Sequence, residues 1–267
     1  MQTVVDFFSH YKEVSAFAFS IGALVFSVVA YFQKSKETVR TLRSQLADTI
    51  MKLMALNPQI TELNDQIDKL ATLRSEKPSE AKDAENENRR LRSLRSSYSE
   101  QRLALAQMAV FLMGHEEMNQ RLISNVEYAA VADAFNGAGE IENSQVYWEK
   151  AINASQMGPY KTKLKGQYAD FLARRVGFDK AKEMYKRAVL LPDDPSDALL
   201  WEVIYIYARW SRMEAGAGHL DDAEALWKKA IDTCDTMKSE KRRQDGHQNV
   251  LVDPPAKTAS RLKAESG

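Results

Sequence analysis

Hydrophobic positions divide the chain into four regions with different spacing. An uncharged apolar run lies in residues 1–33, a heptad pattern in 34–113, a repeated pattern of aromatic residues and alanine in 114–237, and a polar tail in 238–267. No convincing run alternates apolar and polar residues as a half-buried strand would. The pattern predicts an all-α protein with an N-terminal transmembrane helix, a coiled-coil-like helical stalk or hairpin, and a solenoid of about three helix pairs.

The apolar run extends from Val14 to Phe32 without a charged residue. Because a helix rises about 1.5 Å per residue, this run is long enough for a hydrocarbon core of about 30 Å. More basic residues follow the run than precede it, which favours a cytoplasmic location for the remainder of the chain. The sequence therefore predicts a single-pass protein of a membrane such as the bacterial inner membrane, with residues 14–32 in the lipid bilayer.

Two other interpretations of this run stay open. A cleaved signal peptide would have Val28 and Ala30 as the small residues before the cut, but Lys12 is the only basic residue that precedes the run. A buried core helix would normally keep a polar stripe, which this run lacks.

A heptad seam follows the apolar run, since apolar residues recur there at alternating steps of three and four. With Thr49 at its one polar position, the seam consists of Val39, Leu42, Leu46, Leu53, Leu56, Ile60, Leu63, Ile67 and Leu70. Asn57 and Pro58 have the signature of a helix N-cap followed by proline at the first helical position. A kink or a break is therefore expected at that point.

A second seam begins after a polar stretch, residues 75–88, that reads as a turn around Pro78. With Gln101 as its polar interruption, it consists of Leu91, Leu94, Tyr98, Leu105, Met108 and Leu112. Two such helices can fold back on each other as an antiparallel hairpin, or each can pair with a second copy of the chain. The sequence leaves both arrangements open, and the second would make a homo-oligomer.

Three segments of residues 124–237 end alike, with an aromatic residue followed three positions later by alanine. A small residue precedes each aromatic residue by four positions, and a glycine turn comes before that. The three sets are Gly139, Ser144, Trp148 and Ala151; Gly177, Ala181, Tyr185 and Ala188; and Gly218, Ala223, Trp227 and Ala230. Small residues let two helices approach closely, and the aromatic residue fills the gap to the next repeat.

This pattern resembles the tetratricopeptide repeat family, whose unit is a helix pair. The first repeat matches best, and it also has Tyr128, Val131, Ala132 and Phe135 at the expected positions. In the third repeat Glu214 stands where an aromatic residue belongs, so a longer or shifted first helix is expected. Ordinary amphipathic hairpins of another helical bundle remain the alternative.

The resemblance implies a ligand groove, because ligands of the tetratricopeptide family usually lie against the first helix of each repeat. The corresponding positions in this chain are Asp133, Asn136, Lys163, Gln167, Asp170, Arg174, Tyr205, Arg209 and Arg212. The basic members could hold an acidic segment of a protein partner by charge-assisted hydrogen bonds. A solvated polar face is the other interpretation of these residues.

Composition and motifs argue against other classes of function. Basic and acidic residues balance at 37 each, so the overall basic excess that drives nucleic-acid binding is missing. His115 begins a stretch like a zinc-protease helix, but Asn119 stands where the second histidine must be. We expect no catalytic residue, no metal site, no cofactor and no nucleic-acid partner.

Beyond Met237 the chain is polar and contains adjacent prolines, so residues 238–267 are expected to be disordered. The combined patterns predict a membrane-anchored scaffold or adaptor that binds a protein partner through its groove. The alternative is a structural subunit of a larger membrane assembly, in which the stalk heptads drive self-association.

Overall fold

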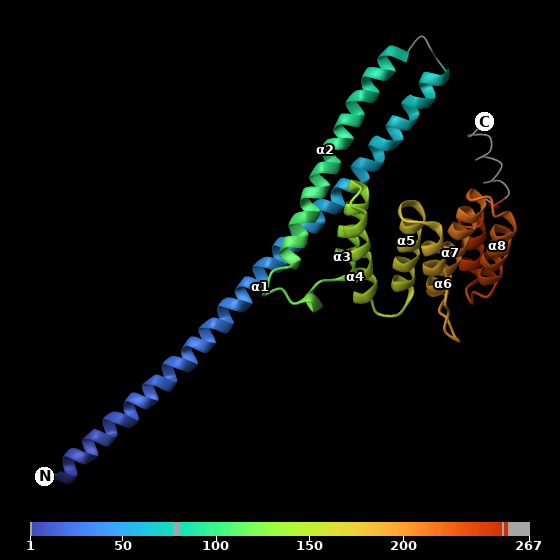
Figure 1. The fold of residues 1–267 in the computed structure, drawn as a ribbon. Helices are drawn as coiled ribbons and strands as arrows, with labels where there is room; N and C mark the ends of the chain where they lie inside the picture. Colours follow the sequence, from blue (N-terminus) through green and yellow to red (C-terminus); the bar gives the residue numbers. More distant parts are fainter. Residues whose placement is uncertain (1, 77–80, 253, 256–267) are drawn as a thin grey trace.

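A computed structural model shows that the chain is built from helices and loops, with no strand among the described residues (Figure 1). The structure describes residues 2–76, 81–252 and 254–255, with side chains for 33–72 and from 83 onward. The all-α expectation is therefore confirmed for this part of the chain.

The expected transmembrane helix is not supported. α1 (Gln2–Glu76) is one long helix, and no helix in the described part of the chain is both long and apolar enough to cross a membrane. From Gln33 onward, charged residues are interspersed along α1, which is why that part does not qualify. The side chains of the predicted span, Val14–Phe32, lie outside the described residues. The prediction of a single-pass membrane protein, and of its location in a membrane, is corrected accordingly.

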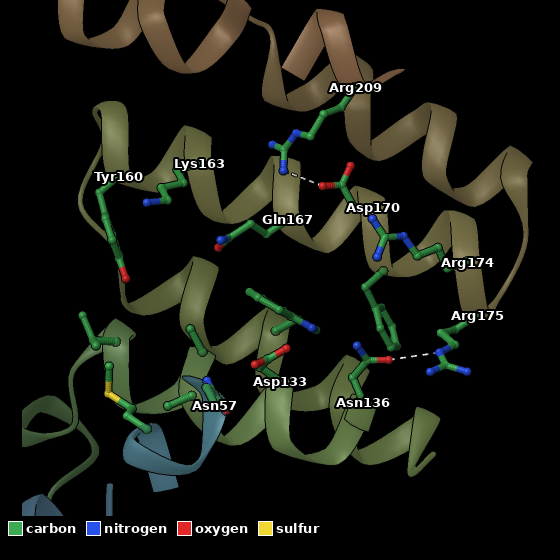
Figure 2. Close-up of a pocket in the computed structure, with 16 residues that line it drawn as sticks. Asn57, Asp133, Asn136, Tyr160, Lys163, Gln167, Asp170, Arg174, Arg175 and Arg209 are labelled. Atoms are coloured by element: carbon green, nitrogen blue, oxygen red, sulfur yellow. Dashed lines mark hydrogen bonds and ion pairs between the residues drawn. The ribbon is translucent and has the colours of Figure 1, made fainter. Parts of the chain in front are cut away.

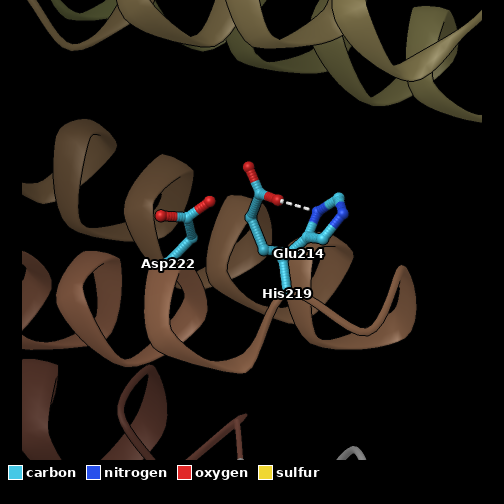
Figure 3. A group of neighbouring side chains, drawn as sticks. All are labelled: Glu214, His219 and Asp222. Carbon is cyan, nitrogen blue, oxygen red and sulfur yellow. Dashed lines mark hydrogen bonds and ion pairs between the residues drawn. The ribbon is translucent and has the colours of Figure 1, made fainter.

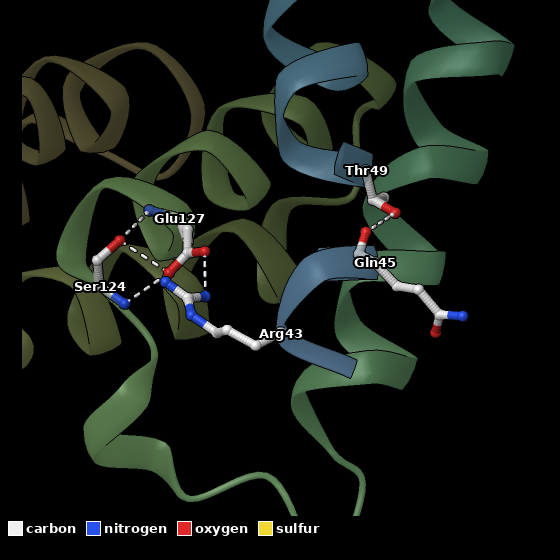
Figure 4. A network of polar contacts seen from close by, with 5 residues as sticks. All are labelled: Arg43, Gln45, Thr49, Ser124 and Glu127. Carbon is white, nitrogen blue, oxygen red and sulfur yellow. Dashed lines mark hydrogen bonds and ion pairs between the residues drawn. The ribbon is translucent and has the colours of Figure 1, made fainter. Parts of the chain in front are cut away.

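α1 and α2 (Ala81–Met113) lie side by side as an antiparallel hairpin (Figure 1). The predicted seam of α1 faces α2, and Leu46 and Leu53 in it are fully buried. The polar seam position, Thr49, is satisfied within α1, because its hydroxyl donates to the carbonyl oxygen of Gln45 at 2.7 Å (Figure 4). The expected break does not occur, and α1 continues through Pro58 as one helix. The predicted turn at 77–80 lies outside the described residues.

α2 buries only part of the seam that its heptad pattern predicted. Leu91 and Leu112 are buried as expected and Tyr98 and Leu105 are partly buried, whereas Leu94 and Met108 are 39% and 53% exposed. The buried positions between them include Ala106 and Ala109. The reason is that the C-terminal half of α2 packs against both α1 and α3, and small side chains permit this double approach.

Three helix pairs follow the hairpin (Figure 1). They are α3 (Asn125–Ala138) with α4 (Ile141–Ala154), α5 (Pro159–Arg175) with α6 (Phe178–Ala188), and α7 (Asp197–Gly216) with α8 (Leu220–Asp235). A short 3₁₀ helix, η2 (Gln120–Leu122), connects the hairpin to α3. As expected for the third repeat, α7 is the longest of the three first helices.

Residues of the repeated pattern pack inside and between the helix pairs. Ser144, Ala181 and Ala223 have no exposed surface, so the two helices of each pair are in close contact there. Between the first and second pairs, the rings of Trp148 and Tyr168 stack with centroids 6.4 Å apart. The aromatic residues therefore join neighbouring pairs, while the small residues join the helices within a pair.

One hydrophobic core runs from the hairpin into the repeats, since Leu46 and Ala106 belong to the same cluster as Val131 and Leu164. A separate small cluster around Leu63 and its neighbours lies at the far end of the hairpin. The hairpin and the first repeats thus share their buried interior instead of meeting at a solvated linker.

The chain after Met237, predicted to be disordered, forms α9 (Glu240–Asn249) on α7 and α8. The Asp197 carboxylate accepts from the backbone N–H groups of Lys238 and Ser239, each at 2.9 Å. These hydrogen bonds explain why the pKa of Asp197 is lowered. Residues 256–267 of the predicted tail lie outside the described residues.

Candidate binding groove

A hollow of about 440 Å³, called the groove below, lies between α1, α3 and α5 (Figure 2). α5 and α7 approach closely at Gly166, where an added Cβ would lie 2.6 Å from Cγ1 of Ile206. α3 and α5 instead leave the space of the groove between them. Its lining residues are Met54, Asn57, Val126, Ala129, Ala130, Asp133, Asn136, Trp148, Tyr160, Lys163, Gln167, Asp170, Phe171, Arg174, Arg175 and Arg209.

Most of the predicted groove residues meet here. The seven that line the groove are Asp133, Asn136, Lys163, Gln167, Asp170, Arg174 and Arg209. Tyr205 lines a second hollow of about 300 Å³ beside it, which shares three residues with the groove. Arg212 lines neither hollow, because its Nη2 donates to the carbonyl oxygen of Val250 at 3.2 Å, where the chain after α9 folds back on α7.

The sequence did not indicate that the stalk contributes to the groove. Met54 and Asn57 of α1 line it, as do Trp148 of α4 and Tyr160 at the start of α5. The resemblance pointed only to the first helix of each repeat, whereas docking of α1 on α3 depends on contacts distant in sequence. For Asn57 the sequence predicted only a helix N-cap before Pro58, and not a place in the groove.

Asp133 and Asn136 on α3 each accept a hydrogen bond from an arginine side chain. Arg102 of α2, which is buried, donates to the Asp133 carboxylate at 2.5 Å. Nε of Arg175 donates to Oδ1 of Asn136 at 3.1 Å (Figure 2). Arg102 of the hairpin thus neutralises the negative charge that Asp133 contributes to the groove.

Asp170, on α5, is held by two donors. Its carboxylate accepts from the Tyr185 hydroxyl at 2.6 Å and from Nη1 of Arg209 at 2.5 Å. Burial raises the pKa of Asp170, and the nearby Arg209, Tyr185 and Arg174 lower it without cancelling that effect. Asp170 and Arg209 therefore satisfy each other and leave little net charge for a ligand.

Lys163, Gln167 and Arg174 are the polar groups that remain available. Within the described part of the chain, no hydrogen bond or ion pair engages any of the three side chains. In Figure 2 all three lie on α5 and border the open space. Since Asp133 and Asp170 each have an arginine partner, the cations Lys163 and Arg174 give the groove a positive surplus.

Two atoms in the groove walls lack the hydrogen bonds that their burial calls for. Trp148 is only 6% exposed, and its indole N–H has no acceptor. Oδ1 of Asn57 is likewise buried without a donor. An unsatisfied buried polar group costs about 1–3 kcal/mol, so a small shift of either side chain toward the hollow would let a ligand satisfy it.

Glu214, His219 and Asp222 form a second cluster of side chains, away from the groove (Figure 3). The buried Glu214 carboxylate accepts from the Trp210 indole N–H at 3.0 Å, and the Lys182 ammonium lies 3.1 Å from it. Lys182 thus already provides the positive charge that a bound cation would supply. In the repeat pattern Glu214 replaces an aromatic residue, and here it joins α6 to α7 by polar contacts.

Comparisons with known proteins add no family to this description. No model of a protein family matches the chain, and no curated protein matches it either. The likeness to tetratricopeptide repeats therefore rests on the repeated residues and on the three helix pairs they form, and ligand chemistry has to be inferred from the groove itself.

Proposed function

We propose that this chain is a binding module of the tetratricopeptide type, which holds an acidic segment of a protein partner in the groove. The main support is the pair of cations Lys163 and Arg174 on the face of α5 that borders the hollow, since no hydrogen bond or ion pair holds either of them within the described residues. The two cations are eleven residues apart on α5, about 16 Å along the helix. Two carboxylates of one acidic segment, one at each cation, would therefore gain charge-assisted hydrogen bonds, which are about twice as strong as neutral ones.

The surrounding charges favour such a ligand. Asp133 and Asp170 would repel an acidic segment if they were free, but each is paired with an arginine. The remaining carboxylate nearby, Glu202, lines the second hollow; burial raises its pKa, and the nearby cations Lys163 and Arg209 lower it without cancelling that effect. The residues that line the groove therefore include more cations than carboxylates, and both of those carboxylates are paired with arginine.

The arrangement supports binding in preference to catalysis. The carboxylates of the groove are tied to arginine, and the described residues that line it include no serine, cysteine or histidine. A nucleophile paired with a base, which acyl or phosphoryl transfer would need, is not assembled there. We do not extend the proposal to self-association through the heptads, because α1 and α2 already pack against each other within one chain.

Fluorescence anisotropy with the full-length chain tests the proposal. A labelled pool of acidic peptides should bind, whereas a matched pool with Asp and Glu replaced by Asn and Gln should not. The double variant Lys163→Glu with Arg174→Glu should weaken binding by about tenfold or more, because it removes two charge-assisted contacts. Binding should also weaken as salt concentration rises.

The matched control is Lys180→Glu with Lys228→Glu, which makes the same charge change at exposed positions on α6 and α8. The proposal predicts that this control binds the acidic pool like the unmodified chain. Equal loss of binding in both double variants would show that net charge alone attracts the peptides, and no binding by the unmodified chain would refute the assignment outright.

A further inference from the structure

The groove has two ends of different chemistry. Figure 2 shows Asn57 and Tyr160 toward one side and Arg174 and Arg175 toward the other. The arginines of the second end, together with Lys163 beside Tyr160, account for an acidic ligand, but they leave the apolar surface where α1 enters the groove without a role.

The α1 end presents apolar surface to solvent. Met54 of α1, Val126 of α3 and Tyr160 of α5 are 46%, 42% and 41% exposed, although all three line the same hollow. Ala129 and Ala130 of α3 also line the hollow, and their small side chains take up little of its space. Exposed apolar side chains that converge on one concavity are the usual sign of a seat for an apolar group.

The two unsatisfied atoms of the groove walls, one of them on α1, add a polar requirement. The Trp148 indole can only donate a hydrogen bond, and the Asn57 oxygen can only accept one. Every residue of an extended peptide, proline apart, offers one carbonyl oxygen and one N–H group. A peptide group therefore carries one partner of each kind.

We propose that the α1 end of the groove seats an apolar side chain and the peptide group beside it, so that the ligand is an extended segment in which an apolar residue adjoins acidic residues. This inference rests on the proposed function, and it makes the hairpin part of the receptor. Met54 is the specificity-determining contact for the apolar side chain, and Asn57 receives the ligand N–H.

The hairpin is held firmly enough to serve as a wall. Arg43 of α1 pairs with Glu127 of α3, and Arg102 of α2 pairs with Asp133 on the same helix (Figure 4 shows the first pair). These contacts lie on α3 itself, which also carries Val126. The apolar end is therefore built into the folded chain and does not depend on a flexible segment.

Three labelled peptides test the inference in the full-length chain: an acidic peptide with a central leucine, the same peptide with serine in place of leucine, and the leucine peptide N-methylated at that residue. We expect the leucine peptide to bind about tenfold more tightly than the serine peptide, which is at the lower end of what burying a leucine contributes. N-methylation should also weaken binding, because it removes the ligand N–H.

Variants then assign each effect to a residue. Met54→Gln should remove most of the preference for leucine over serine, whereas Met51→Gln, on the same helix but outside the groove, should keep it. Asn57→Leu should bind the leucine peptide less tightly than the unmodified chain does. Because this variant has no side-chain oxygen to accept from the ligand N–H, N-methylation of the peptide should reduce its affinity less than it reduces that of the unmodified chain. Its helicity, followed by circular dichroism, should be unchanged.

Failure of this inference is distinguishable from failure of the proposed function. If Lys163→Glu with Arg174→Glu abolishes binding but leucine and serine peptides bind equally to the unmodified chain, the groove reads charge alone and the apolar seat is refuted. A leucine preference that survives Met54→Gln unchanged would refute the role of α1. If no acidic peptide binds at all, both the proposed function and this inference are overturned.

Discussion

Glu127 stands at the junction of the hairpin and the repeats and does two jobs there (Figure 4). Its carboxylate accepts from the backbone N–H of Ser124 at 2.7 Å, which completes a capping box at the start of α3. It also pairs with Arg43 of α1. Burial alone would raise the pKa of Glu127, but the hydrogen bonds from Arg43 and Ser124 outweigh it, and the pKa lies below its ordinary value of 4.5.

Replacement of Glu127 should therefore destabilise the chain in a pH-dependent way. Glu127→Gln should lower the free energy of unfolding by about 1–3 kcal/mol at neutral pH, because Arg43 loses its partner. Since the folded-state pKa is below the unfolded one, this stabilisation is fully present above pH 4.5 and is lost as the pH falls through the folded-state pKa. Urea unfolding of both proteins across that range measures it; a pH-independent difference would contradict the assignment.

Single residues were the scale at which sequence reasoning worked best inside the repeats. Ser144, Ala181 and Ala223 were expected between paired helices, and all three are buried there. Their positions could be predicted because close helix packing demands small side chains at fixed spacing. Arg212 could not be placed in the same way, because its contact with Val250 depends on where the chain folds after α9.

Whole elements were harder to predict, and α2 and α9 show why. A heptad pattern indicates which residues are apolar, but the face that is buried depends on which neighbours surround the helix, and α2 has both α1 and α3. α9 carries no apolar stripe, and only Gly246 in it is buried. It is held by the Ser239 cap, by hydrogen bonds to Asp197 and by close packing, none of which leaves a hydrophobic period in the sequence.

Gly246 should be the critical residue of α9. A Cβ at this position would lie 2.6 Å from Sγ of Cys234, so Gly246→Ala should loosen α9 and destabilise the chain by about 1–3 kcal/mol, although alanine favours helices over glycine. Hydrogen exchange of the α9 amides should speed up. The exposed Gln248→Ala serves as the control, and the double variant with Cys234→Ala should recover part of the loss; an unchanged exchange rate in Gly246→Ala would exclude this packing role.

Parts of the molecule that share one hydrophobic core are expected to unfold together. Leu46 of the hairpin shares a core cluster with the first two repeats and part of the third, whereas Ile67 belongs to the separate cluster near the hairpin end. The rest of the third repeat, with Trp227, has a cluster of its own. The four tryptophans, at positions 148, 201, 210 and 227, all lie in the repeats, so their fluorescence reports on that part alone.

A change in the hairpin should therefore be visible from the repeats. Leu46→Ala should destabilise the fluorescence-detected transition by about 2–5 kcal/mol, because it leaves a cavity in the shared core. Ile67→Ala should shift that transition much less, although it deletes a buried side chain of similar size. Equal shifts for the two variants would mean that the hairpin is cooperative along its full length, and no shift for Leu46→Ala would mean that it unfolds independently of the repeats.

Met54 and Asn57 of α1 form part of the groove wall, so ligand binding in the groove depends on the docking of the hairpin against α3. Because that wall exists only while α1 rests on α3, an occupant that touches it must strengthen the α1–α3 contact by the same free energy that the contact lends to the occupant. Ligand binding in the groove and docking of the hairpin on α3 are therefore coupled in both directions. A second partner that binds the hairpin far from the groove and changes its docking on α3 would change the affinity of the groove for its ligand.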